Sequence, residues 1–323
     1  EEVPKEAGIR DIYFEPEFAR VVIHAEKPGM VIGKAGDVLT KIKEKTFWAP
    51  DIKRAPVIDS ELIKAIRKML HKEAGYRKKF LNSIGDKIYG DKKDVEWIRL
   101  TALGGFREVG RSCMLISTPQ SRVLLDCGIM PSNAANAKPY PYLDAPEFNI
   151  QTLDAVILSH AHIDHCAMVP FLYEMGYRGP LYCTRPTRDT AVMLQMDSIK
   201  IAQHEGRKMA YASKAIEEMI KHCITLEYGE VTDITPDFRL TLENAGHLLG
   251  SASVHLHIGD GMYNILYTAD YKYERTPLFE PASLNYARVE AVITESTYGG
   301  VVTPTHRDGE ISLVAKVKEV IAR

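Results

Sequence analysis

The richest cluster of metal-binding side chains in this sequence is His160-Ala-His162-Ile-Asp164-His165. Three imidazoles and a carboxylate within six residues pack poorly in a hydrophobic core, but they are ligand types that zinc prefers. His160 and His162 are two residues apart and can face one ion, while Asp164 and His165 can turn toward a second. The spacing predicts the nucleus of a two-zinc hydrolase site rather than a solvated polar loop.

A short apolar segment directly precedes this cluster. Residues 154–159 read DAVILS and predict a buried strand that ends where the histidines begin. Four further apolar runs end before a residue that could serve the same site: 123–125 before Asp126, 239–243 before His247, 265–267 before Asp270, and 291–293 before Glu295. This repeated placement predicts that distant parts of the chain meet at one metal centre.

The order of these motifs resembles a known family. Asp126, the HxHxDH run, His247 in Gly-His-Leu-Leu-Gly, and Asp270 follow one another as in motifs one to four of the metallo-β-lactamase fold. Glu295 matches the first motif of the β-CASP nucleases. Within that group, the chain resembles the archaeal KH-domain proteins related to the nuclease subunit of the cleavage and polyadenylation specificity factor. The resemblance covers nearly the whole chain.

The resemblance implies a ligand set for two zinc ions, made of His160, His162, Asp164, His165, His247 and Asp270. The first two histidines and His247 would hold one ion, the pair Asp164 and His165 would hold the other, and Asp270 would bridge them. Histidine and carboxylate ligands also suit iron or manganese, so zinc is the expected metal but not the only one that fits.

Three residues are implied as catalytic, namely Asp126, Asp164 and Glu295. Asp126 is expected to orient a histidine ligand or the water, and Glu295 to support proton delivery through a later histidine. β-CASP enzymes carry two further histidine motifs downstream, but the chain stops at Arg323, and His306 lies too close to Glu295 to substitute. We therefore expect a truncated chain that binds one zinc well and the second poorly.

A second module is predicted near the start of the chain. Residues 20–25 (RVVIHA) alternate like a strand, Gly33-Lys34-Ala35-Gly36 follows, and residues 37–45 have helical spacing. A GxxG loop that opens a helix lets a nucleic-acid backbone come close, with Lys34 facing phosphates. The loop alone could be an ordinary helix-opening turn. With its strand and helix it resembles a KH domain, whose RNA-binding residues would be the four residues of this loop.

Composition and motif order predict at least two domains, because 323 residues with 45% hydrophobic content can bury a substantial core. The expected α/β architecture is a KH module over 1–84, a linker over 85–98, a metallo-β-lactamase αββα sandwich over 99–299, and the start of a β-CASP domain over 300–323. Residues 61–89 are predicted to be a basic helix, either a solvated face or a track for RNA phosphates. The net charge of −2 leaves RNA attraction to such local patches.

Several classes of protein are disfavoured. The sequence has neither an apolar run of membrane-spanning length nor a signal-peptide pattern, so we expect a soluble cytoplasmic protein with no membrane partner. Five cysteines without CxxC spacing argue against a disulfide framework and a thiolate zinc site. His255 and His257 alternate along an apparent strand and are expected to be structural.

The favoured function is a zinc-dependent endoribonuclease acting on single-stranded RNA in 3′-end processing or transcription termination, with or without 5′–3′ exonuclease activity. Expected partners are single-stranded RNA, the transcription machinery, and a second copy bound through the missing C-terminal part. Two alternatives stay open. The KH module and Glu295 disfavour a small-molecule hydrolase of the same fold, and the intact ligand set disfavours a non-catalytic RNA-binding subunit.

Overall fold

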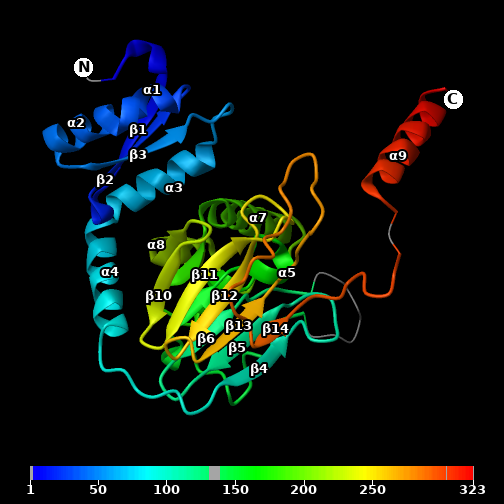
Figure 1. Cartoon of the computed structure of the whole chain (residues 1–323). Helices are drawn as coiled ribbons and strands as arrows, with labels where there is room; N and C mark the ends of the chain where they lie inside the picture. Colours follow the sequence, from blue (N-terminus) through cyan, green and yellow to red (C-terminus); the bar gives the residue numbers. More distant parts are fainter. Residues whose placement is uncertain (1–2, 131–138, 303, 323) are drawn as a thin grey trace.

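The computed structural model describes residues 3–130, 139–302 and 304–322. Its N-terminal module is a three-stranded sheet with two helices on one face (Figure 1). The strands are β1 (Ile9–Glu15), β2 (Arg20–Ala25) and β3 (Ala49–Arg54), and the helices are α1 (Pro28–Ile32) and α2 (Asp37–Thr46). Alternate residues of β2, namely Val21, Ile23 and Ala25, form a small core with Val31 of α1. The predicted strand 20–25 and the helix that follows the GxxG loop are confirmed.

The larger domain contains two mixed sheets packed face to face (Figure 1). The six-stranded sheet runs in the order β4 (Arg99–Gly104), β5 (Cys113–Ser117), β6 (Arg122–Leu125), β7 (Ala155–Ile157), β8 (Leu181–Thr184) and β9 (Cys223–Leu226). The five-stranded sheet runs in the order β10 (Val231–Thr235), β11 (Phe238–Asn244), β12 (Ala252–Ile258), β13 (Tyr263–Tyr267) and β14 (Ala291–Ile293). β6 to β9 are parallel, as are β13 and β14. We call this domain the sandwich.

Four helices cover the outer face of the six-stranded sheet: α5 (Ile163–Cys166), α6 (Val169–Glu174), α7 (Arg185–His204) and α8 (Ser213–His222). Side chains of one strand alternate between two cores. In β6, Val123 and Leu125 pack between the sheets, whereas Leu124 packs against the helices. Because both faces are covered, these three residues are all apolar, as a buried parallel strand requires. The predicted α/β sandwich preceded by a KH-like module is confirmed.

The outer face of the five-stranded sheet is contacted by residues 271–290, which form no regular element. Asn244 donates its side-chain amide to the Pro281 carbonyl, and His255 Nε2 lies 3.0 Å from the Arg288 carbonyl. His257 Nδ1 is 2.7 Å from Asn264 Oδ1. Both histidines therefore have structural partners on this face. The last helix, α9 (His306–Ile321), extends away from the sandwich (Figure 1), and no helix in the described ranges is long and apolar enough to cross a bilayer.

The predicted single helix over residues 61–89 is wrong in one respect. The chain forms α3 (Glu61–Lys72) and α4 (Ala74–Ile88), which meet at Glu73, where ψ is 8°. The break lets both helices bury apolar groups: Ile66 joins the core under α5 to α8, and Phe80 packs its ring 4.8 Å from that of His222. α4 also extends through the first residues of the expected linker 85–98, so irregular chain begins only after Ile88.

A buried ion pair joins the N-terminal module to the sandwich through α4. Arg77 Nε donates to Glu17 at 2.7 Å, and both side chains are at most 4% exposed. The same guanidinium donates to the backbone carbonyls of Lys221 and Cys223, at the junction of α8 and β9. Arg77, which lies in the predicted basic helix, therefore stabilises the fold and does not form part of a solvated helix face.

Replacing Arg77 by methionine is expected to lower the free energy of unfolding by about 3–5 kcal/mol, because the Glu17 carboxylate stays buried without its partner. Urea unfolding followed by circular dichroism measures this. Arg275→Met is the control, since its ion pair with Glu280 is well exposed and should contribute less than about 1 kcal/mol. Equal effects of the two substitutions would contradict the assignment.

Candidate metal centre and nucleic-acid surface

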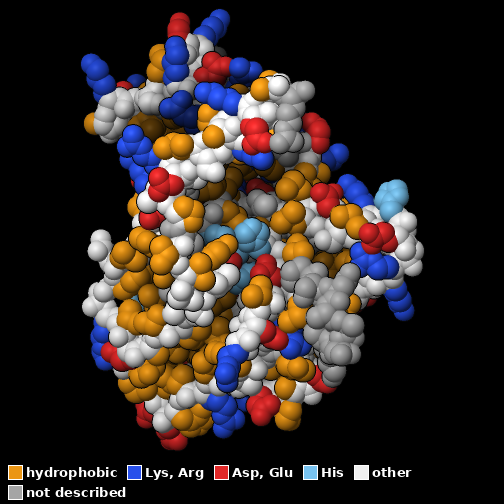
Figure 2. Space-filling model, turned by 90° about the vertical axis from the view of Figure 1, so that its right-hand side faces the viewer, with side chains coloured by type: hydrophobic (Ala, Val, Ile, Leu, Met, Phe, Trp, Pro, Cys, Tyr) orange, Lys and Arg blue, Asp and Glu red, His pale blue; other side chains and the backbone are white. Residues whose placement is uncertain are grey.

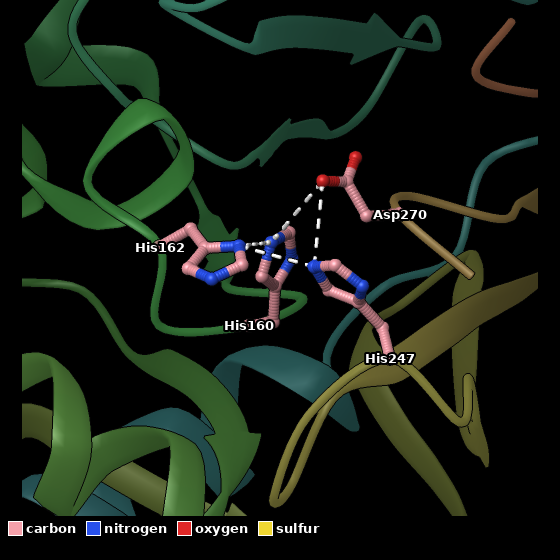
Figure 3. Close-up of side chains that lie close together, drawn as sticks. All are labelled: His160, His162, His247 and Asp270. Atoms are coloured by element: carbon pink, nitrogen blue, oxygen red, sulfur yellow. Dashed lines mark hydrogen bonds and ion pairs between the residues drawn. The ribbon is translucent and has the colours of Figure 1, made fainter. Parts of the chain in front are cut away.

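Four side chains from distant parts of the chain converge at one end of the sandwich (Figure 3). His160 and His162 follow β7, His247 follows β11, and Asp270 follows β13. One ligand atom from each lies within 4.8 Å of all the others. On the face shown in Figure 2, histidine side chains gather in a hollow at the centre. The strands that the sequence predicted to end at one site therefore do so.

Four of the distances within this group are close to those between the ligands of one tetrahedral ion. His162 Nδ1 is 3.2 Å from His160 Nε2 and 3.1 Å from His247 Nε2. Asp270 Oδ2 is 3.7 Å from His160 Nε2 and 3.6 Å from His247 Nε2. Tetrahedral bonds of zinc length place ligand atoms about 3.3 Å apart. Three nitrogens and one oxygen at this spacing fit zinc.

A second ligand group adjoins the first. His165 Nε2 is 3.5 Å from Asp270 Oδ1 and 3.9 Å from Asp164 Oδ2. Asp270 thus presents one oxygen to each group. The structure brings all six predicted ligands together, the first four in a tight set and Asp164 with His165 beside them.

His247 is positioned by the Gly-His-Leu-Leu-Gly loop, which is tied to the N-terminus of α7. The hydroxyls of Thr184 and Thr187 both donate to the Gly250 carbonyl, at 2.7 and 2.8 Å. Gly250 has φ +85°, and a Cβ there would lie 2.7 Å from Thr184 Oγ1. Only glycine therefore allows this close approach, which explains the residue at that position.

Asp126 is fully buried and lies behind the ligands instead of among them. Its Oδ2 accepts hydrogen bonds from His165 Nδ1 at 2.8 Å, from the Ser159 hydroxyl at 2.7 Å and from the Tyr267 hydroxyl at 2.8 Å. Its Oδ1 accepts from the Ser159 backbone N–H at 2.7 Å. A His165 ring that donates from Nδ1 presents Nε2 to Asp164 and Asp270. Ser159 and Tyr267 were not identified from the sequence as partners of Asp126. The only feature of the sequence that points to them is that each lies beside or near a candidate ligand in the chain.

The charges around the site divide the histidines into two kinds. Burial, with the neighbouring histidines adding to it, holds the pKa of His160 well below its ordinary value, which favours the neutral form that binds metals. Burial acts in the same direction on His165, but the carboxylates of Asp126 and Asp270 outweigh it and raise the pKa of His165 to about 10. The His165 imidazole thus interacts strongly with the carboxylates of Asp126 and Asp270.

A cavity of about 550 Å³ opens beside the second ligand group. Asp164, His165 and Asp270 line one side, and Glu295 lines the cavity with them. Glu295 accepts a hydrogen bond from the Thr297 backbone N–H at 2.8 Å. It faces the site without belonging to the four-residue ligand set.

The GxxG loop lies in the N-terminal module, between α1 and α2 (Figure 1). Gly33 has φ +77°, and a Cβ there would lie 2.1 Å from Asp37 Oδ1, so the loop needs glycine at its first position. Lys34 and Ala35 are exposed. The loop therefore offers its backbone and one cation to solvent, as a phosphate-binding turn requires.

The five cysteines are all free and buried. Cys127 and Cys166 adjoin Asp126 and His165 in sequence, but the Cys166 thiol donates to the Ala161 carbonyl. No cysteine belongs to the four-residue ligand set among the described residues.

Comparisons with known proteins agree with this arrangement. Residues 115–297 match the metallo-beta-lactamase superfamily domain, and residues 1–46 match the KH domain. The chain is similar to the transcription termination factor FttA of Methanothermobacter thermautotrophicus, with 50% identity over 324 residues, which cover 99% of this chain and 51% of that protein. It is also similar to FttA of Methanosarcina mazei, with 49% identity over 328 residues, covering 100% and 51%.

A third relative, FttA of Methanocaldococcus jannaschii, is 49% identical over 325 residues, which cover 99% of this chain and 51% of that protein. The chain spans about half the length of the curated relatives it matches. The family match to residues 115–297 covers more than half of the chain. The sandwich carries the candidate metal-ligating residues and follows the GxxG module in the sequence. The chain therefore belongs to the metallo-beta-lactamase superfamily and carries a KH domain in front of that fold.

Proposed function

We propose that this chain provides the RNA-binding module and the metal centre of a zinc-dependent endoribonuclease that hydrolyses single-stranded RNA. The observation that carries the proposal is Asp270, whose two oxygens face two adjacent ligand groups. Paired ligand groups that share a carboxylate are typical of sites that hydrolyse phosphodiesters. A KH domain in the same chain adds a surface for single-stranded RNA.

Each site residue has a proposed role. His160, His162 and His247 would hold the first zinc, Asp164 and His165 would hold the second, and Asp270 would contribute one oxygen to each group. Bound zinc lowers the pKa of a water molecule and stabilises negative charge on the phosphate.

Two further carboxylates are proposed to act from outside the ligand set. Asp126 fixes the ring of His165 so that Nε2 points at the site. Glu295 supports proton delivery to the leaving oxygen from its place on the cavity wall. Asp164 lines the same cavity and is proposed to contribute to catalysis as well as to metal binding.

The names of the relatives support a biological setting. We propose that cleavage occurs in the cytoplasm during transcription termination or 3′-end formation, with the transcription machinery as a partner. A homodimer and accompanying 5′–3′ exonuclease activity are further proposals, which rest on the β-CASP resemblance alone.

The test is elemental analysis of bound metal beside cleavage of an end-labelled single-stranded RNA, for the wild type and for His160→Ala. We expect zinc in the wild type, and loss of both zinc and cleavage in the variant. His257→Ala is the matched control, because its ring bonds Asn264 away from the site. Cleavage that survives His160→Ala, or a wild type that binds neither zinc nor single-stranded RNA, would overturn the proposed function.

The GxxG loop supplies a separate prediction for RNA binding. Substituting Lys34→Asp and Ala35→Asp together is expected to weaken RNA binding by about tenfold or more at low salt, because two carboxylates would face the phosphates. Both side chains are exposed and both glycines remain, so the fold should persist. Fluorescence anisotropy measures the dissociation constant. Lys200→Asp with Gln203→Asp on the exposed face of α7 changes the net charge equally, and an equal loss there would contradict a specific role for the loop.

A further inference from the structure

The loop between β4 and β5, residues 105–110, shares the cavity with the metal ligands. Phe106, Arg107 and Val109 line it together with Asp270 and Glu295. Phe106 is 44% exposed and Val109 is 69% exposed. A partly exposed aromatic ring on the wall of this cavity offers a flat face on which a nucleobase can stack. This loop, which we call the 105–110 loop, was not singled out in the sequence.

The 105–110 loop is held rigid by its own ion pair. Arg111 donates to both oxygens of Glu108, at 2.7 and 2.9 Å, and Glu108 also accepts from the Gly105 backbone N–H at 3.1 Å. The Arg111 guanidinium lies 4.5 Å from the centre of the Tyr142 ring. Directly after it, the Ser112 N–H donates to the Asp164 carbonyl at 2.9 Å. The loop is therefore anchored to the helix that carries Asp164 and His165.

Arg107 is the exposed cation of this cavity. It has φ +58°, a left-handed conformation that non-glycine residues adopt only when their surroundings impose it. The cavity lining otherwise contains carboxylates, namely Glu108, Asp164, Asp270 and Glu295, and among the described lining residues Arg107 is the one lysine or arginine. No ion pair or hydrogen bond of its side chain is present in the described part of the chain. A free cation held in a strained position beside acidic groups is placed to receive an anion.

We propose that the 105–110 loop is a preformed clamp for single-stranded RNA, in which Phe106 stacks on a nucleobase next to the cleaved bond and Arg107 binds a neighbouring phosphate. The clamp rests on the proposed function and specifies how substrate enters its site. Aromatic rings stack on any base, while arginine pairs with phosphate oxygens. The combination selects an unpaired strand, because a base inside a duplex cannot reach the ring.

The test measures RNA binding apart from cleavage. A fluorescent oligonucleotide of about six nucleotides with phosphorothioate linkages resists hydrolysis and fits the expected size of one single-strand site. Binding is measured in the Lys34→Asp, Ala35→Asp background, which removes the contribution of the GxxG loop. Bound zinc and melting temperature are recorded for every variant.

Phe106→Ala is expected to weaken binding about 5- to 100-fold, and Phe106→Trp to preserve it. An oligonucleotide with abasic sites should bind the wild-type loop and Phe106→Ala equally, because there is no base to stack. Arg107→Ala should lower the slope of log affinity against log salt by about 0.7, and Arg107→Lys should keep it. Tyr89→Ala and Arg275→Ala, at exposed sites elsewhere, are the controls.

Three results separate the clamp from the proposed function. If the protein cleaves RNA while Phe106→Ala and Arg107→Ala bind as tightly as the parent, the clamp is wrong and the nuclease assignment stands. The clamp is equally wrong if Phe106→Ala loses the same affinity for the abasic oligonucleotide as for the normal one. If the unaltered protein neither binds nor cleaves single-stranded RNA, the proposed function fails and the clamp fails with it.

Discussion

Replacing Asp270 by alanine is expected to weaken zinc binding at both ligand groups, so that one ion or none stays bound, and to lower RNA cleavage by about 10³-fold or more. The reason is that Asp270 places Oδ2 near His160 and His247 and Oδ1 near His165. Its loss removes one ligand from each group. Metal stabilisation of the transition state contributes several kcal/mol, and about 4 kcal/mol corresponds to 10³-fold in rate.

His165→Ala provides the informative comparison. It removes a ligand from the second group only, because the four atoms of the first set come from other residues. We expect that variant to keep about one zinc, with activity also lost. Elemental analysis after gel filtration gives the stoichiometry, and a gel assay gives the rate. Two zinc ions retained by Asp270→Ala would show that its carboxylate does not bridge.

The convergence of the candidate ligands was predictable because each of them follows a recognisable strand in the sequence. β7 and β14 are apolar runs, β11 and β13 carry apolar residues at their buried positions, and the residues that follow these strands lie at the candidate site or its cavity. The alternation in β6 between two cores explains why Val123, Leu124 and Leu125 are all apolar. Local pattern is enough where both faces of a strand are buried, as in β7, because burial then dictates the residue type.

Contacts between distant, ordinary residues were not predictable. Ser159 and Tyr267 are common residue types, and only the folded chain shows that both donate to Asp126. Glu17 and Arg77 look like surface charges in sequence, yet they pair in the interior. No proline in the sequence marks the break at Glu73. The break follows from the packing of α3 and α4 on different parts of the sandwich.

The 105–110 loop is a third case in which the sequence alone did not predict the role of a segment. Its sequence, Gly-Phe-Arg-Glu-Val-Gly, suggests a turn between two strands, and an exposed aromatic in a turn has no obvious role. The role depends on the cavity that the loop shares with Asp270 and Glu295, which lie more than a hundred residues away in the chain. Tertiary structure, and not local pattern, creates that neighbourhood.

Asp126→Asn is expected to weaken binding of the second zinc by about 10- to 100-fold while the first zinc stays bound. Asparagine tolerates the left-handed conformation that Asp126 adopts, at φ +54°, so the backbone should be preserved. An amide oxygen can still accept from the Ser159 N–H, but the NH₂ group at the other position cannot accept from His165 Nδ1. The His165 ring then loses the partner that orients it.

The same substitution is expected to lower the free energy of unfolding by about 3 kcal/mol, because the Ser159 and Tyr267 hydroxyls also lose a buried charged acceptor. Tyr267→Phe is the matched control, since it deletes one donor without changing shape and leaves the Asp126–His165 contact in place. It should cost about 1 kcal/mol and keep both ions. Zinc titration at limiting metal, followed by thermal unfolding, measures both effects. If Asp126→Asn binds two ions as tightly as the wild type, the orientation of His165 by Asp126 does not govern the second site.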